Sequence, residues 1–490
     1  MATSGMQAAS AMGRVERPLN VLWLMSDQHA AGALGCYGNR IVRTPRLDRL
    51  AAEGLRFERA YCSYPVCVPA RFTMLTGRYP HHTGCTGNHT PLPLRERTVA
   101  HHFSAAGYAT AFIGKMHPVD AQTHGFDYYV DFGHYYDYLG PRTEVYVLGM
   151  GAGDTGAGMP WLSMYFERPD RASWNALRPE RPRGPGAIAR ALEPAQVLPE
   201  EDHFESFVAR ETIRFLRTYR DEPLFVVASL LKPHAPFAPP PEYRALYSPD
   251  EIPLPRWPAG HLDAVPAQSK ARPIPGAGTP AGDAIARQFL TAYYGNVSHL
   301  DECCGRILDA LDELGLRERT LVLYTTDHGE MAYEHGLHGK GNFFDGAARI
   351  PLIARLPGVV PAGTATRALV DQGDFVPTLL ELCGVAPAPR SRPLDGASFA
   401  PVLRDPSSRG KPFAFGEYAL GSGRPFYMLR DERWKYIYYT AGELREQLYD
   451  LENDPGEFTN LALDPGHRPT CERLRAQLFT FLGDAAPASA

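Results

Sequence analysis

Short, uninterrupted apolar runs recur along the chain, and polar residues follow each of them. The clearest cover residues 19–25, 109–113, 223–231 and 320–326, with a further run at 350–354. Apolar runs of this length are typical of strands buried on both faces of a parallel sheet. Amphipathic segments that predict helices lie between them, at 45–53, 97–106, 201–219 and 285–314. The alternation predicts an α/β fold with a large mixed, mostly parallel sheet flanked by helices.

The pattern changes after about residue 380. A Pro-rich connection at 385–393 leads to residues 427–439, whose composition predicts an antiparallel hairpin turning at 431–433, and a terminal helix follows. Earlier in the chain, the Gly- and Pro-rich segment 141–199 predicts a long surface excursion. We therefore predict a disordered tail, an α/β domain and a smaller α+β domain with an antiparallel sheet, at 1–16, 17–380 and 381–490.

Composition narrows the classes of function. The net charge of −5 and a pI near 6.4 give no basic field for nucleic acid, and no apolar run approaches the length of a membrane span. The first sixteen residues lack the apolar stretch of a secretory signal, and the eight cysteines include no C-x-x-C pair. We expect a soluble, cytoplasmic protein with reduced thiols and no nucleic-acid or membrane partner.

Polar residues stand directly after four of the predicted strands. They are Asp27 and Gln28, Lys115 and His117, His234, and Asp327 and His328. A single histidine at a strand end is usually a hydrogen-bonded bystander. Ligands of open α/β sheets bind at the carboxyl ends of the strands, however, so four such clusters together predict one active site.

A cysteine stands where another helix is predicted to begin. In Cys67-Val68-Pro69-Ala70-Arg71, Pro69 suits a first helical turn, and Gly77 ends the helix predicted over 69–76. Helix N-termini attract anions, and Arg71 lies one turn on, where it could hold an oxyanion at residue 67. The alternative is a buried cysteine that packs as a small hydrophobe. Asn88, in a loop further on, could contact substrate.

The strand-end residues have the chemistry of a metal site with a cationic wall. Asp27, Gln28, Asp327 and His328 offer three oxygen donors and one imidazole. This set favours one divalent ion, Ca²⁺ first and Mn²⁺ or Mg²⁺ as alternatives, over structural zinc. Five side chains that can carry positive charge could bind an anionic substrate. They are Arg71, Lys115, His117, His234 and Lys340, and Lys340 lies in a loop interrupted by glycines.

The segment from Cys67 to Arg71, continued by Leu75-Thr76-Gly77-Arg78, resembles the signature of the type I sulfatases of the alkaline phosphatase superfamily. Ala70 replaces the serine that is commonest there. The resemblance implies an alkaline-phosphatase-like fold and hydrolysis of a small-molecule sulfate ester. It also implies that Cys67 is oxidised to formylglycine (3-oxoalanine), the catalytic nucleophile, by a formylglycine-generating enzyme.

The resemblance also implies roles for individual residues. With residue 67, the metal ligands would be Asp27, Gln28, Asp327 and His328. Arg71 and Lys115 would steady the hydroxyl groups of the modified residue. His117 would take the proton in the step that releases sulfate. His234 and Lys340 would hold the sulfate group and assist the leaving oxygen.

Departures from the commonest family pattern keep alternatives open. Gln28 and His328 look like the branch that contains choline sulfatases and phosphonate monoester hydrolases. The run Gly-Lys-Met-His ending at His117, with His124 beyond it, is similar to choline sulfatases and favours sulfate esters. Asn88 matches a substrate-contacting position of the phosphonate enzymes. A phosphonate monoester or phosphodiester hydrolase therefore remains an alternative, as does a non-catalytic metal-binding module. The hairpin at 427–439 could offer an edge for homo-oligomer formation.

Overall fold

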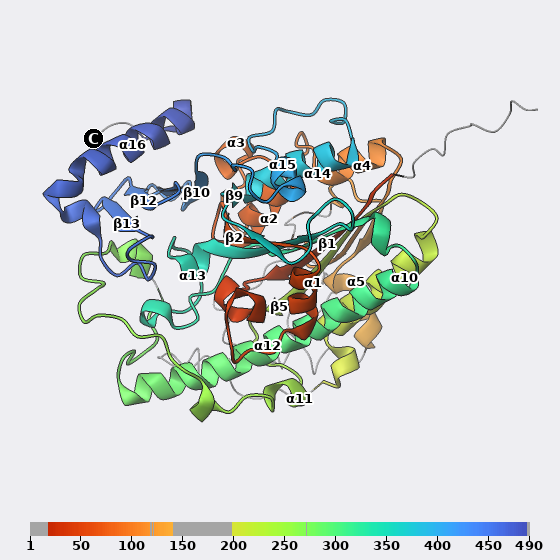
Figure 1. Cartoon of the computed structure of the whole chain (residues 1–490), viewed down its shortest axis with the longest axis horizontal. Helices are drawn as coiled ribbons and strands as arrows, with labels where there is room; N and C mark the ends of the chain where they lie inside the picture. The colour runs from red at the N-terminus through yellow and green to blue at the C-terminus, as the bar shows by residue number, and fades with distance from the viewer. Residues whose placement is uncertain (1–17, 118–119, 121, 141–197, 271, 488–490) are drawn as a thin grey trace, which may run out of the picture.

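The computed structural model describes residues 18–117, 120, 122–140, 198–270 and 272–487 (Figure 1). The predicted tail at 1–16 and nearly all of the predicted excursion at 141–199 lie outside these ranges. The described part of the chain contains a nine-stranded sheet and a separate four-stranded sheet. The strands of the large sheet are β1 Asn20–Asp27, β2 Leu55–Tyr61, β3 Ala109–Gly114, β4 Tyr128–Val130, β5 Leu224–Pro233, β6 Thr320–Thr326, β7 Arg349–Arg355, β8 Thr364–Thr366 and β9 Val370–Asp371.

The large sheet has the order β4-β3-β5-β1-β6-β7-β2-β8, with β9 also paired to β2. The four strands with polar ends are its neighbours β3, β5, β1 and β6, and they are mutually parallel. Only β7, within the described sheet, runs antiparallel to its neighbours β6 and β2. The predicted fold class is confirmed, and the parallel neighbours bring four carboxyl ends to one edge.

Helices cover both faces of this sheet (Figure 1). One face carries α2 Cys67–Thr76, α3 Pro80–Thr83, α4 Val99–Ala105, α14 Phe375–Cys383 and α15 Ala400–Arg404. The other carries α1 Pro45–Ala52, α5 Phe132–Leu139, α10 Phe204–Tyr219 and α12 Pro280–Glu313. In β1, Trp23 packs in the hydrophobic core on one face of the sheet, and its neighbours Leu22 and Leu24 pack in the core on the other face. Burial on both faces explains why these strands are apolar without alternation.

The structure corrects two predicted helix starts. Helix α2 begins at Cys67 rather than Pro69, so the cysteine is its first residue. Helix α12 begins five residues before the predicted start, because Thr279 accepts a hydrogen bond from the Gly282 N–H and Pro280 occupies the first helical position. The connecting segment before it contains the short helix α11 Pro241–Arg244.

The second sheet lies in the C-terminal part of the chain. Its strands are β10 Ala414–Tyr418, β11 Phe426–Arg430, β12 Trp434–Tyr439 and β13 Glu446–Asp450, and α16 Arg468–Leu482 packs on it. The predicted hairpin is confirmed as β11 and β12. Its predicted role as an open edge is wrong, because β10 pairs with β11 and β13 pairs with β12. Among the described helices, including the long α12, none combines the length and apolar character of a membrane span.

Candidate active site

The start of α2 fixes the position of Cys67. Val66 before it is extended, and the Asn88 side-chain oxygen accepts a hydrogen bond of 3.0 Å from the Val68 N–H. Pro69 has no N–H to satisfy, so this helix start loses no donor there. Cys67 as a whole is 1% exposed. Asn88, predicted as a substrate contact, therefore also holds the turn that presents residue 67.

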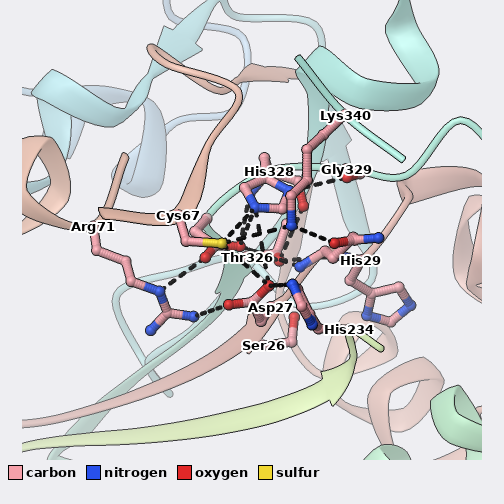
Figure 2. Close-up of polar contacts among 12 residues, drawn as sticks. Ser26, Asp27, His29, Cys67, Arg71, His234, Thr326, His328, Gly329 and Lys340 are labelled. Carbon is pink, nitrogen blue, oxygen red and sulfur yellow. Dashed lines mark hydrogen bonds and ion pairs between the residues drawn. The ribbon is translucent and has the colours of Figure 1, made fainter. Parts of the chain in front are cut away.

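Ionisable side chains from the strand ends and from the loop of Lys340 surround the Cys67 sulfur (Figure 2). His328 Nε2 lies 3.2 Å from Sγ and Asp27 Oδ1 lies 3.8 Å from it. The ammonium groups of Lys340 and Lys115 lie 3.6 and 3.9 Å away. The sulfur is thus between two possible ligands of a cation and two groups that attract an anion.

Arg71 binds one oxygen of each of the two carboxylates of the site. Its Nη2 donates to Asp27 Oδ2 and its Nε to Asp327 Oδ2, both at 2.8 Å. Its Nη1 donates to Ser229 Oγ at 2.9 Å and to the Lys115 carbonyl. The described side chains give Arg71 no hydrogen bond to Cys67. Arg71 orients the two carboxylates, and its expected role at the hydroxyl groups of a modified residue 67 stays a prediction.

The opposite oxygens of these carboxylates converge with Cys67. Ligand atoms of Asp27, Cys67, Asp327 and His328 all lie within 4.8 Å of one another, and all four side chains are buried. His328 Nε2 is 3.9 Å from Asp27 Oδ1 and 3.6 Å from Asp327 Oδ1. Two carboxylates and an imidazole in this arrangement fit a divalent cation.

Gln28 links this cluster to the loop that carries Lys340. Its side-chain oxygen accepts a hydrogen bond from Lys340 Nζ, and its side-chain nitrogen donates to Glu330. Glu330 also accepts hydrogen bonds from the backbone N–H groups of Ala332 and Gly339. Gln28 itself has a φ of 61°, a left-handed conformation that is uncommon outside glycine and often found at functional sites.

His117 and His234 follow the neighbouring strands β3 and β5. His117 is buried and has a φ of 68°. His234 Nε2 lies 4.0 Å from Asp27 Oδ1, and its other ring nitrogen is 2.7 Å from the Ala235 carbonyl. The His234 side chain is 16% exposed and Lys340 is half-buried, in contrast to the carboxylates. The site is therefore reached past His234 and Lys340.

Comparisons with known proteins decide the family. The family model described as Sulfatase matches residues 19–385, and a second one, described as N-sulphoglucosamine sulphohydrolase, C-terminal, matches residues 333–482. The chain belongs to the sulfatase family. As a sulfatase it is an enzyme, a hydrolase of sulfuric esters.

Individual relatives span nearly the whole sulfatase chain. It is 30% identical over 456 residues to the choline-sulfatase of Rhizobium meliloti (strain 1021), covering 91% of this chain and 83% of the relative. It is 28% identical over 478 residues to the arylsulfatase of Clostridium perfringens (strain 13 / Type A), covering 94% and 93%. The crystal structure of the phosphonate monoester hydrolase of Agrobacterium radiobacter has the same fold, with a TM-score of 0.75, 24% identity and 96% of each chain covered.

The surroundings of Asp27 and His328 keep the carboxyl group ionised and the imidazole neutral. Burial opposes ionisation of Asp27, but the charges of Lys115 and Arg71 outweigh it and hold the pKa of this carboxyl well below its ordinary value. Burial lowers the pKa of His328 to about 4, against the opposing charge of Asp327, so the imidazole is neutral and can serve as a ligand.

Three other groups are shifted toward their neutral forms. Burial, with Asp27 beside it, raises the pKa of the Cys67 thiol, so the unmodified side chain is not a thiolate. Burial and Lys115 hold the pKa of His117 well below its usual range, and burial and Lys340 do the same for His234. Both imidazoles are therefore neutral at pH 7 and able to accept a proton.

Sequence reasoning missed three residues that shape the site. Glu330 orients Gln28, and Ser229 accepts a hydrogen bond from Arg71. Gln372 donates to the Asp327 carbonyl at 2.6 Å and accepts from the Ser63 N–H at 3.0 Å. Glu330 follows Asp327 so closely in the sequence that its place near the site could have been predicted. Gln372 is far along the chain and in no motif, so nothing in its surroundings pointed to the site.

Proposed function

We propose that this sulfatase hydrolyses small-molecule sulfate esters through a formylglycine made from Cys67 by a formylglycine-generating enzyme. One observation carries the proposal most directly. The side chain of residue 67 lies at the start of a helix, with ligand atoms of Asp27, Asp327 and His328 on one side and the Lys115 and Lys340 ammonium groups nearby. Anionic ester and nucleophile would meet where both positive charge and a metal are at hand.

The metal would be held by Asp27, Asp327, His328 and residue 67. Gln28 would join them once its side-chain oxygen turns from Lys340. We favour Ca²⁺, with Mn²⁺ and Mg²⁺ as alternatives, because the carboxylate and amide oxygens outnumber the single imidazole. When bound, the ion would lower the cost of ionising the hydroxyl of residue 67 and neutralise charge on the ester.

The remaining side chains would divide the chemistry. Lys115 would hold an oxygen of residue 67, and Arg71 would keep the two carboxylates in place. His234 and Lys340, the more accessible groups, would bind the sulfate oxygens and assist the departing alcohol. His117, buried and neutral, would accept the proton from residue 67 in the step that releases sulfate.

A second candidate function is hydrolysis of phosphonate monoesters or phosphodiesters. The observation that favours it is Asn88, which matches a substrate-contacting position of those enzymes and hydrogen-bonds the backbone next to residue 67. The names of the relatives, choline-sulfatase and arylsulfatase, favour sulfate esters first.

The test compares kcat/KM for an aryl sulfate, choline sulfate, a phosphate diester and a phosphonate monoester, since this ratio measures transition-state stabilisation. Mass spectrometry of the peptide that spans residue 67 should show the thiol replaced by an aldehyde or its hydrate. Cys67→Ala is the matched control and should be inactive. Higher efficiency on phosphonates would reverse the two candidates, and full activity with an unmodified thiol would refute the formylglycine.

Two further assignments are proposals of the same kind. We place the enzyme in the cytoplasm because its eight cysteines are all free, as expected in a reducing compartment. We also keep residues 381–490 as a C-terminal α+β domain, supported by the separate sheet β10-β11-β12-β13. Self-association, if it occurs, would need a surface other than the enclosed hairpin.

A further inference from the structure

A second buried group of metal-ligating side chains lies between α10 and α12, which pack side by side (Figure 1). His203 immediately precedes α10, Glu205 lies in its first turn, and His299 is in the middle of α12. Their exposed fractions are 8%, 1% and 0%. One ligand atom from each lies within 4.8 Å of the other two.

In each of the two imidazoles, one ring nitrogen has a polar partner and the other has none among the described residues. His299 Nε2 lies 3.1 Å from Glu200 Oε1, while its buried Nδ1 has no hydrogen-bond partner among the described residues. The Leu198 backbone hydrogen-bonds the His203 ring, while the buried Nε2 of His203 also lacks a partner there. Buried polar atoms are rarely left unsatisfied, so two in one cluster need an explanation.

We propose that His203, Glu205 and His299 form a second metal site, separate from the active-site cluster, that takes Zn²⁺. Two imidazoles and a carboxylate, with a water in the fourth position, are a donor set that zinc prefers, in contrast to the oxygen-rich active site. The Glu200 carboxylate behind His299 is the outer partner that metal-bound histidines usually have, and it leaves Nδ1 for the ion.

The charges of the group are compatible with binding. Burial, together with His299 and Lys232, lowers the pKa of His203 to about 2, so its ring is neutral. Burial opposes protonation of His299, but Cys303 and Glu200 outweigh it and raise the pKa of His299 to about 10. Zinc would therefore displace one proton from His299. The Lys232 ammonium is engaged by the Pro236 carbonyl at 2.8 Å.

A neighbouring group of possible ligands, Glu200, His299 and Cys303, is less suited to an ion. Glu200 already accepts a hydrogen bond of 2.6 Å from Ser206 and pairs with Arg306 at 3.0 Å. These contacts make Glu200 a support for His299.

An ion at this position would join three elements. It would tie α10 to α12 through the two histidines. Glu205 also accepts a hydrogen bond of 3.0 Å from the Lys232 N–H, which places the site against the end of β5, two residues before His234. We assign the ion a stabilising and positioning role, since no ligand of this site touches residue 67.

The test separates this site from the active site. In an Asp327→Asn background, which disables the first site, equilibration with Zn²⁺ and removal of free metal should leave one equivalent of zinc. Adding His203→Gln or His299→Gln should weaken zinc binding at least ten-fold, and Glu200→Gln by a smaller factor. His335→Gln is the matched control, because His335 is also buried with an unpartnered Nδ1 but belongs to no such group. Equal zinc content in all variants would overturn the proposal.

A second measurement does not depend on how the variants fold. Crystals of the protein without substitutions, equilibrated with Ca²⁺ and Zn²⁺, should show an anomalous difference peak at the zinc edge between His203 and His299. Binding should release close to one proton per zinc in a weakly buffered titration. No peak between the two rings at saturating zinc would refute the site, whatever the outcome at residue 67.

Discussion

Two ion networks in this sulfatase differ in how their cations are placed around the carboxylates. Near the C-terminal sheet, Lys435 Nζ donates to Glu457, Asp345 and the Phe343 carbonyl. The remaining carboxylate oxygens are also taken, one by Arg349 and one by the Asp345 N–H. All three ammonium protons and all four oxygens thus have partners. We call this group, Lys435 with Asp345 and Glu457, the closed network.

The active-site network is built differently. Arg71 occupies one oxygen of Asp27 and one of Asp327, and the other two oxygens face His328 and Cys67. The outer oxygen of Asp327 also accepts hydrogen bonds from the Gln28 and His328 N–H groups, but no cation among the described side chains pairs with it. Both networks contain buried charged side chains, so burial and charge alone do not identify a functional site. The difference is that cations hold the active-site carboxylates from one side only, which leaves ligand atoms directed at a common point.

The largest expected effect comes from removing one of the two carboxylates of the active-site network. Asp327→Ala removes a metal ligand and leaves Arg71 without one of its two carboxylates. We expect bound metal to be lost and kcat/KM to fall by roughly 10³-fold or more, since a single group that stabilises transition-state charge is worth about 10²–10³. Metal analysis and steady-state kinetics check this. Full activity of the metal-free enzyme would contradict it.

The two neutral histidines should each be needed in a different step of the reaction. In His117→Ala, the first step should proceed and the release of sulfate should fail, so a chromogenic ester gives a burst of about one leaving group per site and then stops. In His234→Ala the first step itself should slow, by about 10²-fold or more, with no burst. Stopped-flow absorbance distinguishes them. A burst in His234→Ala instead would exchange the two roles.

Breaking the closed network should affect stability and leave catalysis intact. Lys435→Met leaves the buried Glu457 without its cation and Asp345 with Arg349 alone, and loss of one partner of a buried pair typically costs about 3–5 kcal/mol. Urea unfolding should show that decrease, while kcat/KM per folded molecule stays near that of the parent. Asp327→Ala is the reciprocal control, because it should lose activity first. A loss of turnover in folded Lys435→Met would join the two networks functionally.

The smallest effect concerns pH. Burial raises the pKa of Glu457 to about 7 from 4.5, against the charge of Lys435, because one ammonium serves two carboxylates. The folded state therefore binds this proton more tightly than the unfolded chain. The resulting stability is fully present below about pH 4.5 and is lost as pH rises through about 7. Urea unfolding between pH 5 and 8, as a function of pH, should show this decline, and Glu457→Gln should flatten it.

The sequence predicted the strands whose signal is local. The apolar runs before Asp27, Lys115, His234 and Asp327 needed no long-range information, and parallel packing then placed their ends together. Strand β2 was missed, because a register shift between Phe57 and Ala60 interrupts its alternation. The partners of Arg71 were also missed. Its helix position put it near Cys67, but only the tertiary structure shows that its donors point to the carboxylates behind.

The reach of Arg71 has a consequence for how the chain folds. From α2 it contacts Asp27, Asp327 and the Lys115 carbonyl at the ends of β1, β6 and β3, and Ser229 within β5. The Asp327 contact spans 256 residues of sequence. Contacts that close such long loops form late, because their entropy must be lost before they stabilise anything. The ligands Asp27, Cys67, Asp327 and His328 come together only when α2 packs on the paired strands β1 and β6, so we expect metal binding to require this packing.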